Sequence, residues 1–175
     1  TNSDTEVIVH LYEELGEQCV ERLQGMFAIA IWDGPRQKLM LARDHLGQKP
    51  LFYAREGETF LFASEIKGIL AVSQTMPEID YESVHHYLSL RFIPPPRTML
   101  KHIKKLPPAH ILVLQEDEVS ISCYWDLSFR EKRNLSETEF IEELRERLGQ
   151  TVASHLISDV PVGAFLSGGM DSSMV

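Results

Sequence analysis

The sequence is short of cysteine, of positive charge and of long apolar runs, and each shortage excludes a class of protein. Its 175 residues contain two cysteines, Cys19 and Cys123, which form neither a CxxC pair nor a disulfide framework. The formal net charge of −9 disfavours a protein that grips a nucleic-acid backbone through a basic face. The longest apolar run, 26–32, is too short to cross a bilayer. We therefore expect a globular cytoplasmic protein with neither membrane nor nucleic-acid partners.

The sequence also lacks the usual motifs of a metal-binding site. The seven histidines form no HExxH motif and no set of histidine and cysteine ligands. His85 and His86 are adjacent in sequence, and adjacent residues of a helix do not share a face. The sequence therefore gives no certain metal site.

The first 125 residues mix helix and strand patterns. A helix is predicted from Asp4, which could cap it, to Leu15, because apolar residues recur at helical spacing. Strands are predicted at 26–33, 38–43, 50–55 and 59–64, and we expect them to form one antiparallel meander. The stretches FAIAIW and LFYA are apolar on both sides, which predicts an inner sheet covered on two faces. Both cysteines are interpreted as small core residues.

The remaining elements lead to a change of fold type. Helices are predicted at 65–70 and 81–90, a proline-rich connector at 92–97, and a hairpin from strands 111–114 and 119–124. After a polar stretch, SETE at 136–139 predicts a capping box at the start of a long helix. A buried strand is then predicted in SDVPVGAFL, 158–166. Antiparallel strands first and a helix-to-strand unit last indicate two folds in one chain.

The stretch VGAFLSGGMDSS, 162–173, carries the clearest chemical signal. A predicted apolar strand runs into Ser167, Gly168 and Gly169, and a helix should begin near Asp171. Glycines allow a ligand to approach the backbone closely, and amide groups at a helix start favour an oxyanion. The pattern suits a pyrophosphate group, and the plain alternative is an ordinary turn with a serine or aspartate cap.

Two other kinds of functional loop are excluded for this stretch, each by the residues at one or two positions. A Walker A loop needs a lysine before its serine or threonine, and this sequence has Met170 and Asp171 there. A serine-hydrolase elbow needs a glycine two residues before Ser167, where Phe165 stands. Both readings are rejected.

SGGMDSS after an apolar strand resembles the pyrophosphate loop of the ATP pyrophosphatases. Six further segments resemble, in the same order, the class II glutamine amidotransferase domain of asparagine synthetases: SDTE (3–6), LQGMFA (23–28), ARDHLGQKPL (42–51), FASEIK (62–67), PPPRT (94–98) and KLPPAH (105–110). The resemblance implies an α+β sandwich of antiparallel sheets with helices, like the N-terminal-nucleophile hydrolases, followed by the beginning of an α/β domain like the adenine-nucleotide alpha hydrolases. It places the C-terminal part of the amidotransferase domain at 1–125, a linker at 126–135 and the start of the ATP-binding asparagine synthetase domain at 136–175.

The resemblance also assigns binding residues. It implies that ATP is cleaved between its α and β phosphates, with Mg²⁺ accompanying the nucleotide. The ATP-binding residues would be Ser167, Gly168, Gly169, Ser172 and Ser173 around the pyrophosphate, Phe165 and Leu166 beside the adenosine, and Asp171. Asp171 would either cap the helix or help to hold Mg²⁺.

Asp4 matches the family's acidic residue that binds the α-amino group of glutamine, a role that suits a carboxylate. Arg43, Asp44 and Gly47 match an RDxxG turn, which we interpret as structural, with an Arg–Asp pair closing the end of a strand.

Glu65 and Lys67 are likewise interpreted as a domain-packing or domain-interface pair and not as catalytic groups.

The family's N-terminal cysteine nucleophile is not among these residues, and neither Cys19 nor Cys123 can replace it. We therefore expect no catalytic residue and no activity from these 175 residues alone. For the parent protein, the resemblance implies a carbon–nitrogen ligase that uses glutamine and ATP to convert aspartate to asparagine through β-aspartyl-AMP. Two alternatives stay open: a related amidotransferase that adenylates a different carboxylate, and a noncatalytic binding or regulatory relative. The oligomeric state is also open, with a homodimer as one option.

Overall fold

The computed structural model describes residues 3–130 and 132–174, and the chain divides into two compact units, 1–127 and 128–175. Each unit is described by itself. The elements of the first are α1 (Asp4–Leu15), the 3-10 helix η1 (Gly16–Arg22), β1 (Ala28–Asp33), β2 (Lys38–Arg43), β3 (Phe52–Glu56), β4 (Thr59–Ala63), α2 (Ile66–Leu70), α3 (Tyr81–Leu90), β5 (Ile103–Lys105), β6 (His110–Gln115) and β7 (Glu118–Cys123). The predicted helices, strands and hairpin of this unit are all present, with small shifts at their ends.

The strands of the first unit form two antiparallel sheets, with strand orders β1-β2-β6-β7 and β4-β3-β5. The prediction of a single meander through the first four strands is therefore wrong. Residues 44–51 do not form a hairpin turn that would return β3 beside β2. They fold around the buried side chain of Asp44, whose carboxylate accepts hydrogen bonds from three amides of this segment, and the chain passes into the second sheet.

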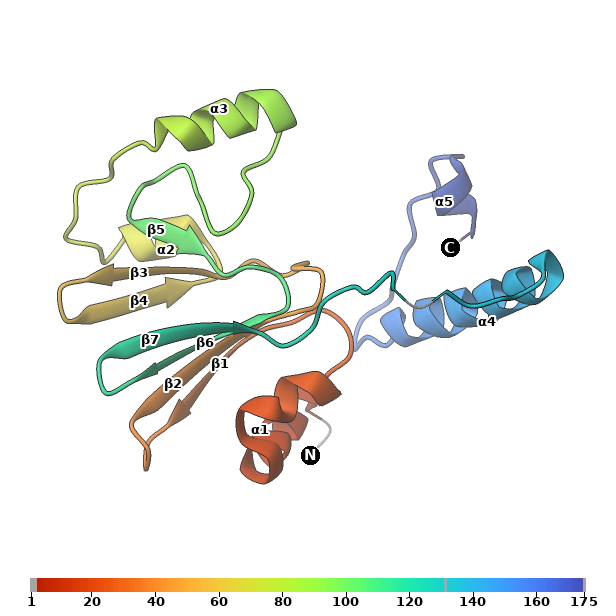
Figure 1. Ribbon diagram of the computed structural model, residues 1–175, viewed down its shortest axis with the longest axis horizontal. Coiled ribbons are helices and arrows are strands. Elements are labelled where there is room, and N and C mark those ends of the chain that lie inside the picture. The colour runs from red at the N-terminus through yellow and green to blue at the C-terminus, as the bar shows by residue number, and fades with distance from the viewer. Residues whose placement is uncertain (1–2, 131, 175) are drawn as a thin grey trace. The chain divides into compact units, whose positions relative to one another are not determined.

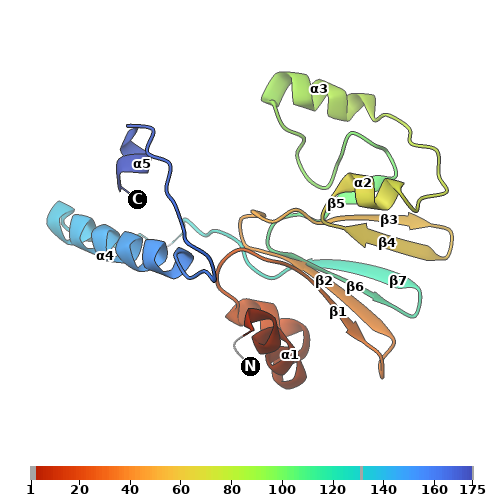
Figure 2. The same ribbon diagram turned by 180° about the vertical axis from the view of Figure 1, so that it is seen from behind.

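The two sheets pack face to face, with α1 and η1 on the outer face of one and α2 on the outer face of the other (Figures 1 and 2). In β3, Tyr53 lies in the core between the sheets and Ala54 lies in the core beneath α2. The prediction of two covered faces is thus confirmed for LFYA. FAIAIW forms the edge strand β1, where Trp32 is 59% exposed. Fully buried side chains such as Leu41 and Leu112 each contribute about 1.5–3 kcal/mol through removal from water.

Polar contacts fix the proline-rich connector beside α3. Asp80 caps this helix by accepting a hydrogen bond from the Glu82 amide at 3.2 Å. Arg97, which follows the prolines, contacts Asp80 at 2.7 Å and Glu82 at 2.6 Å. Residues 92–97 form neither helix nor strand, as their prolines predict.

The second unit contains α4 (Glu137–His155) and α5 (Met170–Met174). The predicted capping box is present: the Ser136 hydroxyl accepts from the Glu139 amide at 3.3 Å, and the Glu139 carboxylate accepts from the Ser136 amide at 2.9 Å. The buried strand predicted in 158–166 is wrong, because these residues are exposed and form no strand. A strand exists through hydrogen bonds to a neighbouring strand, and the described residues after 127 provide none.

The cysteines differ from each other. Cys19 is fully buried beneath the first sheet, as predicted. Cys123 is exposed, which corrects its interpretation as a core residue. It ends β7, an edge strand, and its thiol donates a hydrogen bond to the Trp125 carbonyl at 3.0 Å.

Candidate functional site

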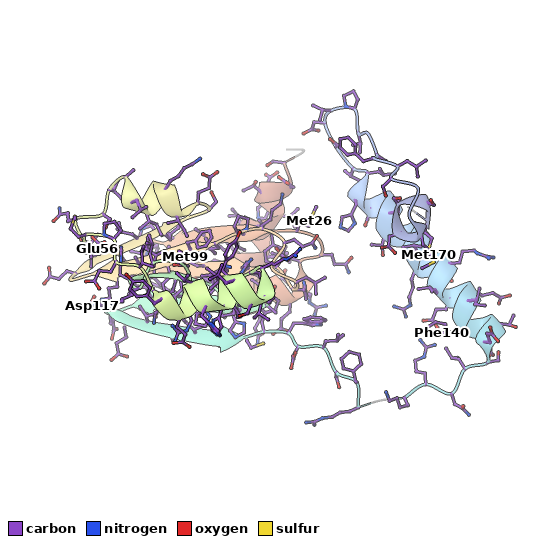
Figure 3. All side chains as sticks on the ribbon, turned by 90° about the horizontal axis from the view of Figure 1, so that it is seen from above. Met26, Glu56, Met99, Asp117, Phe140 and Met170 are labelled. Carbon is purple, nitrogen blue, oxygen red and sulfur yellow. The ribbon has the colours of Figure 1, made fainter. Side chains whose placement is uncertain are left out.

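A pocket of about 460 Å³ lies at the end of the sandwich where β1 and β3 begin. Four of the segments that carry the resemblance line it, through Asp4 and Thr5, Leu23 to Ala28 without Gly25, Lys49 and Pro50, and Ser64. Figure 3 places Met26 at this end of the unit, and Glu56 and Asp117 at the opposite end. The fold therefore brings segments that are far apart in sequence to one hollow.

Asp4 is the first residue of α1, and it does not cap the helix. The cap is Ser3, whose hydroxyl accepts a hydrogen bond from the Thr5 amide at 3.3 Å. The Asp4 carboxylate accepts only the Thr5 hydroxyl, at 3.2 Å, among the hydrogen bonds of the described residues. The alternative that Asp4 caps the helix is therefore wrong, and its exposed carboxylate remains accessible at the pocket.

The pocket pairs opposite charges with an apolar wall. Asp4 supplies a carboxylate and Lys49 an ammonium, and Ile8 and Phe27 are among the apolar residues of the lining. A free amino acid carries both charges as well, so these groups can complement it. A larger pocket of about 810 Å³ lies along α1 and β1, but it contains neither Asp4 nor Lys49.

Asp44 holds the segment that carries Lys49. Its carboxylate accepts hydrogen bonds from the amides of Leu46 at 3.2 Å, Gln48 at 2.9 Å and Lys49 at 2.9 Å. Burial opposes ionisation of this side chain, but these amides outweigh burial and lower the pKa of the carboxyl. The Asp44 amide also donates to the Phe27 carbonyl at 2.9 Å, so one residue positions both sides of the pocket.

Arg43 does not form the predicted pair with Asp44. Its guanidinium donates to the carbonyls of Lys49 at 2.7 Å, Leu106 at 2.7 Å and Gly47 at 2.5 Å. The hydrogen bonds of both buried side chains are thus made with the backbone and not with each other. Backbone amides donate to Asp44, and backbone carbonyls accept from Arg43. The structural interpretation of the turn is confirmed, and its proposed ion pair is corrected.

Gly47 is required by this packing. Its φ is +66°, and an added Cβ would lie 2.8 Å from Pro108 and 2.9 Å from the Arg43 guanidinium carbon.

Glu65 and Lys67 form an exposed ion pair of 2.5 Å just before and within α2. Neither lines the candidate pocket, although their neighbour Ser64 does.

The predicted ATP-binding residues run from an irregular stretch, 165–169, into α5, which contains Asp171, Ser172 and Ser173. Gly168 has a φ of +77°, and the hydroxyls of Ser167 and Ser172 lie 2.9 Å apart. The Gly169 carbonyl accepts from the hydroxyls of Ser172 at 3.1 Å and Ser173 at 2.8 Å. Phe165, Leu166 and Asp171 are exposed, as are most residues of the turn. The glycine turn and the short helix are those that the motif predicts.

Sequence reasoning missed several residues of the pocket. Lys49, Pro50 and Ser64 stand inside segments quoted for the resemblance, but none was assigned a site role. Their position depends on the crossing of the chain between the two sheets, which local periodicity does not encode. The ring of His45 was also missed, and it contacts three aromatic rings behind the pocket.

The comparisons with known proteins agree with this geometry. The two-sheet unit is an α+β sandwich of the N-terminal-nucleophile-hydrolase type, and it is similar in fold to the allosteric regulatory enzyme of purine biosynthesis, with a TM-score of 0.50, 18% identity, and coverage of 92% of this chain and 32% of that chain. The family description "Glutamine amidotransferase domain" matches residues 1–125, and "Asparagine synthase" matches residues 143–175. The chain belongs to the glutamine amidotransferase domain family, with the start of an asparagine synthase domain after it.

Two curated relatives extend the comparison. Asparagine synthetase [glutamine-hydrolyzing] 3 of Bacillus subtilis (strain 168) is 43% identical over 174 residues, which cover 99% of this chain and 28% of that protein. Amidase chry2 of Gibberella zeae is 39% identical over 178 residues, which cover 99% of this chain and 26% of that protein. The chain thus spans less than a third of the length of these relatives. In the described residues, no helix is both long and apolar enough to cross a membrane.

Proposed function

We propose that the protein to which these residues belong is a glutamine-dependent asparagine synthetase, a carbon–nitrogen ligase that uses glutamine, aspartate and ATP. The observation that carries the proposal is the joining, in one chain, of a pocket of about 460 Å³ lined by segments that resemble an amidotransferase and a serine-glycine turn that suits a pyrophosphate group. The matches at 1–125 and 143–175 follow the same order.

On the glutamine side, Asp4 binds the α-ammonium group of the substrate. Its carboxylate is exposed, lines the pocket and is not used as a helix cap. Asp44 keeps the opposite wall in place through the amide of Lys49.

On the ATP side, Ser167, Gly168, Gly169, Ser172 and Ser173 hold the departing pyrophosphate, while Phe165 and Leu166 border the adenosine. The positive φ of Gly168 lets the chain turn tightly, and the hydroxyl groups cluster on one short segment. Mg²⁺ bound with ATP would neutralise phosphate charge, and Asp171, the acidic residue of this loop, would help to hold it.

The chemistry explains why both units are needed. A carboxylate resists attack by ammonia because its oxygen is a poor leaving group, whereas AMP leaves readily. Adenylation of the aspartate side chain gives β-aspartyl-AMP and pyrophosphate, and ammonia released from glutamine then displaces AMP to give asparagine. Ammonia must arrive unprotonated, since ammonium at neutral pH is not a nucleophile.

The glutamine role is tested by Asp4→Asn in the full-length protein. Loss of the charged partner should raise the KM for glutamine by at least about tenfold, the effect of a charge-assisted hydrogen bond. Synthesis from added ammonium salts should stay near the wild-type rate.

Glu14→Gln provides a matched control on the same helix, because Glu14 does not line the pocket. An unchanged KM for glutamine in Asp4→Asn would remove Asp4 from the site.

A second candidate function is an amidotransferase that adenylates another carboxylate. The observation behind it is that a relative 39% identical across 99% of the chain is named an amidase and not an asparagine synthetase. Carboxylate-dependent release of pyrophosphate, measured with aspartate and with other acids, separates the two candidates. Release that requires another acid would favour this second function.

A further inference from the structure

A cavity between the two sheets of the first unit shares no residue with the glutamine pocket, and no function described above uses it. Its volume is about 400 Å³, and residues of β3, β4, β5 and β7 line it, together with His102. Because β5 and β7 are edge strands of their sheets, the cavity opens at the side of the sandwich (Figure 1). Small-molecule sites in proteins have volumes of this order.

One wall of the cavity is the inner face of β7. Val119 and Ile121 lie directly opposite two leucines of β6 that pack in the core between the sheets. Opposite residues of an antiparallel pair share a face, so Val119 and Ile121 also face the second sheet. They are nevertheless 37% and 43% exposed, because β7 lies at the edge.

The other wall is aromatic. The rings of Tyr53 and Phe60 lie nearly parallel, with a centroid distance of 6.0 Å and an interplanar angle of 17°, and both line the cavity. Offset parallel rings present one flat apolar surface. Together with the aliphatic wall of β7, this surface forms a slot that suits a flat apolar body such as an aromatic ring.

The rim of the slot carries one available cation. Lys104 is paired with Tyr53 in the strand register, so its side chain leaves β5 on the face of the cavity. Among the described residues, its ammonium group makes no ion pair and no hydrogen bond. Arg55 also lines the cavity, but its guanidinium is held by Asp117, through the carbonyl at 2.7 Å and the carboxylate at 2.6 Å.

His102 adds a polar atom without a partner. In the described part of the chain, its Nε2 is one of two buried side-chain nitrogen or oxygen atoms that make no hydrogen bond. A buried polar atom of this kind is uncommon, and it marks a place where a ligand group can bind. Glu56 and Glu78 interact electrostatically with His102. Both carboxylates are already held, because Glu56 accepts the Gln74 amide at 3.0 Å and Glu78 pairs with a lysine at 2.9 Å.

We propose that this cavity is a binding site for a small aromatic carboxylate. The ring enters the slot between the aromatic wall and β7, and the carboxylate contacts the Lys104 ammonium and the His102 ring nitrogen. A single negative charge matches the one available cation, whereas a phosphate dianion would lack a second one. The site is separate from the glutamine pocket, and the inference does not rest on the proposed function.

The test is a ligand-observed NMR titration of the full-length protein with 3-phenylpropionate and with its neutral amide. The carboxylate should bind with a Kd of about 0.1–5 mM, as expected for a ligand of so few atoms. The amide should bind about three- to tenfold more weakly, because it lacks the charge. Lys104→Gln should weaken binding of the carboxylate by the same factor and leave binding of the amide unchanged, since both changes remove one contact.

Two further variants locate the site. Ile121→Asp places a charge on the apolar wall and should remove measurable binding of both compounds. Lys101→Gln is the matched control for Lys104→Gln, because Lys101 is an exposed lysine of the same segment that does not line this cavity. Glutamine should not displace the probe, because the two sites share no residue.

The absence of saturable binding of 3-phenylpropionate would overturn the inference. An equal effect of Lys104→Gln and Lys101→Gln would overturn it too, by showing attraction to surface charge in general. Displacement by glutamine would place the probe in the glutamine pocket instead. Self-association of the protein that Ile121→Asp abolishes would assign the slot to a second copy of the chain. If Ile121→Asp does not fold, the comparison of acid and amide in Lys104→Gln decides. Amide synthesis is not measured, so a failure of the proposed function leaves this test unaffected.

Discussion

The two units of the chain differ in what holds them together. The first has three clusters of buried apolar side chains, whereas no residue is buried in the described part of the second. Even so, α4 forms over 19 residues, with its capping box and an ion pair between Glu143 and Arg147. The predicted strand at 158–166 does not form. Short-range contacts therefore suffice for a helix and a glycine turn, while a strand requires a partner.

In the proposed function, the first unit binds glutamine and the second unit binds ATP. The largest expected effect comes from a substitution that removes the ATP-dependent activity alone. Asp171→Ala in the full-length protein should reduce aspartate-dependent release of pyrophosphate by at least about 100-fold, because the carboxylate that would help to hold the Mg²⁺ accompanying ATP is lost. Glutamine hydrolysis should remain largely intact, since Asp171 belongs to the other unit.

Asp159→Ala is the control for this change, because Asp159 is an exposed acid outside the loop. Equal loss of both activities in Asp171→Ala would indicate misfolding and leave the loop without a separate role.

Substitutions in the turn around Asp44 should reduce the stability of the first unit most strongly. Asp44→Asn removes a charge that accepts three amide hydrogen bonds, which should cost about 2–4 kcal/mol. Amide hydrogen exchange in β2 and β6 would report the loss. Asp117→Asn breaks an exposed pair with Arg55 and should cost no more than about 1 kcal/mol.

The contacts of Asp44 also predict that the first unit becomes less stable at low pH. Its pKa is lower in the folded state than in the unfolded state, because the amides prefer the ionised form. The stabilisation is therefore complete above the unfolded pKa of about 4 and is lost as pH falls through the folded value. Asp44→Asn should flatten this part of the stability profile, and an unchanged profile would contradict the assignment.

Alanine substitutions at two glycines with positive φ distinguish the cost of a steric clash from the cost of backbone strain alone. Gly47→Ala meets Pro108 and Arg43 at under 3 Å and should cost about 2–3 kcal/mol, whereas Gly57→Ala, with a φ of +59° and nothing within 4 Å, should cost about 1 kcal/mol. Thermal unfolding of the two variants measures the difference. Equal midpoints would mean that the turn relaxes around the added methyl group.

A small and local effect is expected in the second unit. Ser136→Ala removes the cap of α4 and should cost about 1 kcal/mol, seen as faster amide exchange in its first turn. The first unit should keep its exchange pattern, because its cores include no residue of α4. Slower folding or weaker protection in β2 would show that the units are not independent.

These differences also explain how far sequence reasoning reaches. The helices, hairpins and capping box were predictable because their signals lie within a few residues. The division of the first four strands between two sheets was not, since it depends on how Asp44 gathers three amides of the following segment. The site was partly predictable. Asp4 could be named from its segment, but the fact that Lys49 and Ser64 line the same pocket as Asp4 is visible only in the folded chain.

The central claim is that the two units serve one reaction through an acyl adenylate. The most direct measurement uses aspartate labelled with ¹⁸O in its side-chain carboxylate, together with ATP, glutamine and the full-length protein. If β-aspartyl-AMP forms, one labelled oxygen must appear in AMP, and the pyrophosphate released from ATP must be unlabelled. Label in inorganic phosphate together with ADP, or asparagine formed without labelled AMP, would contradict the account.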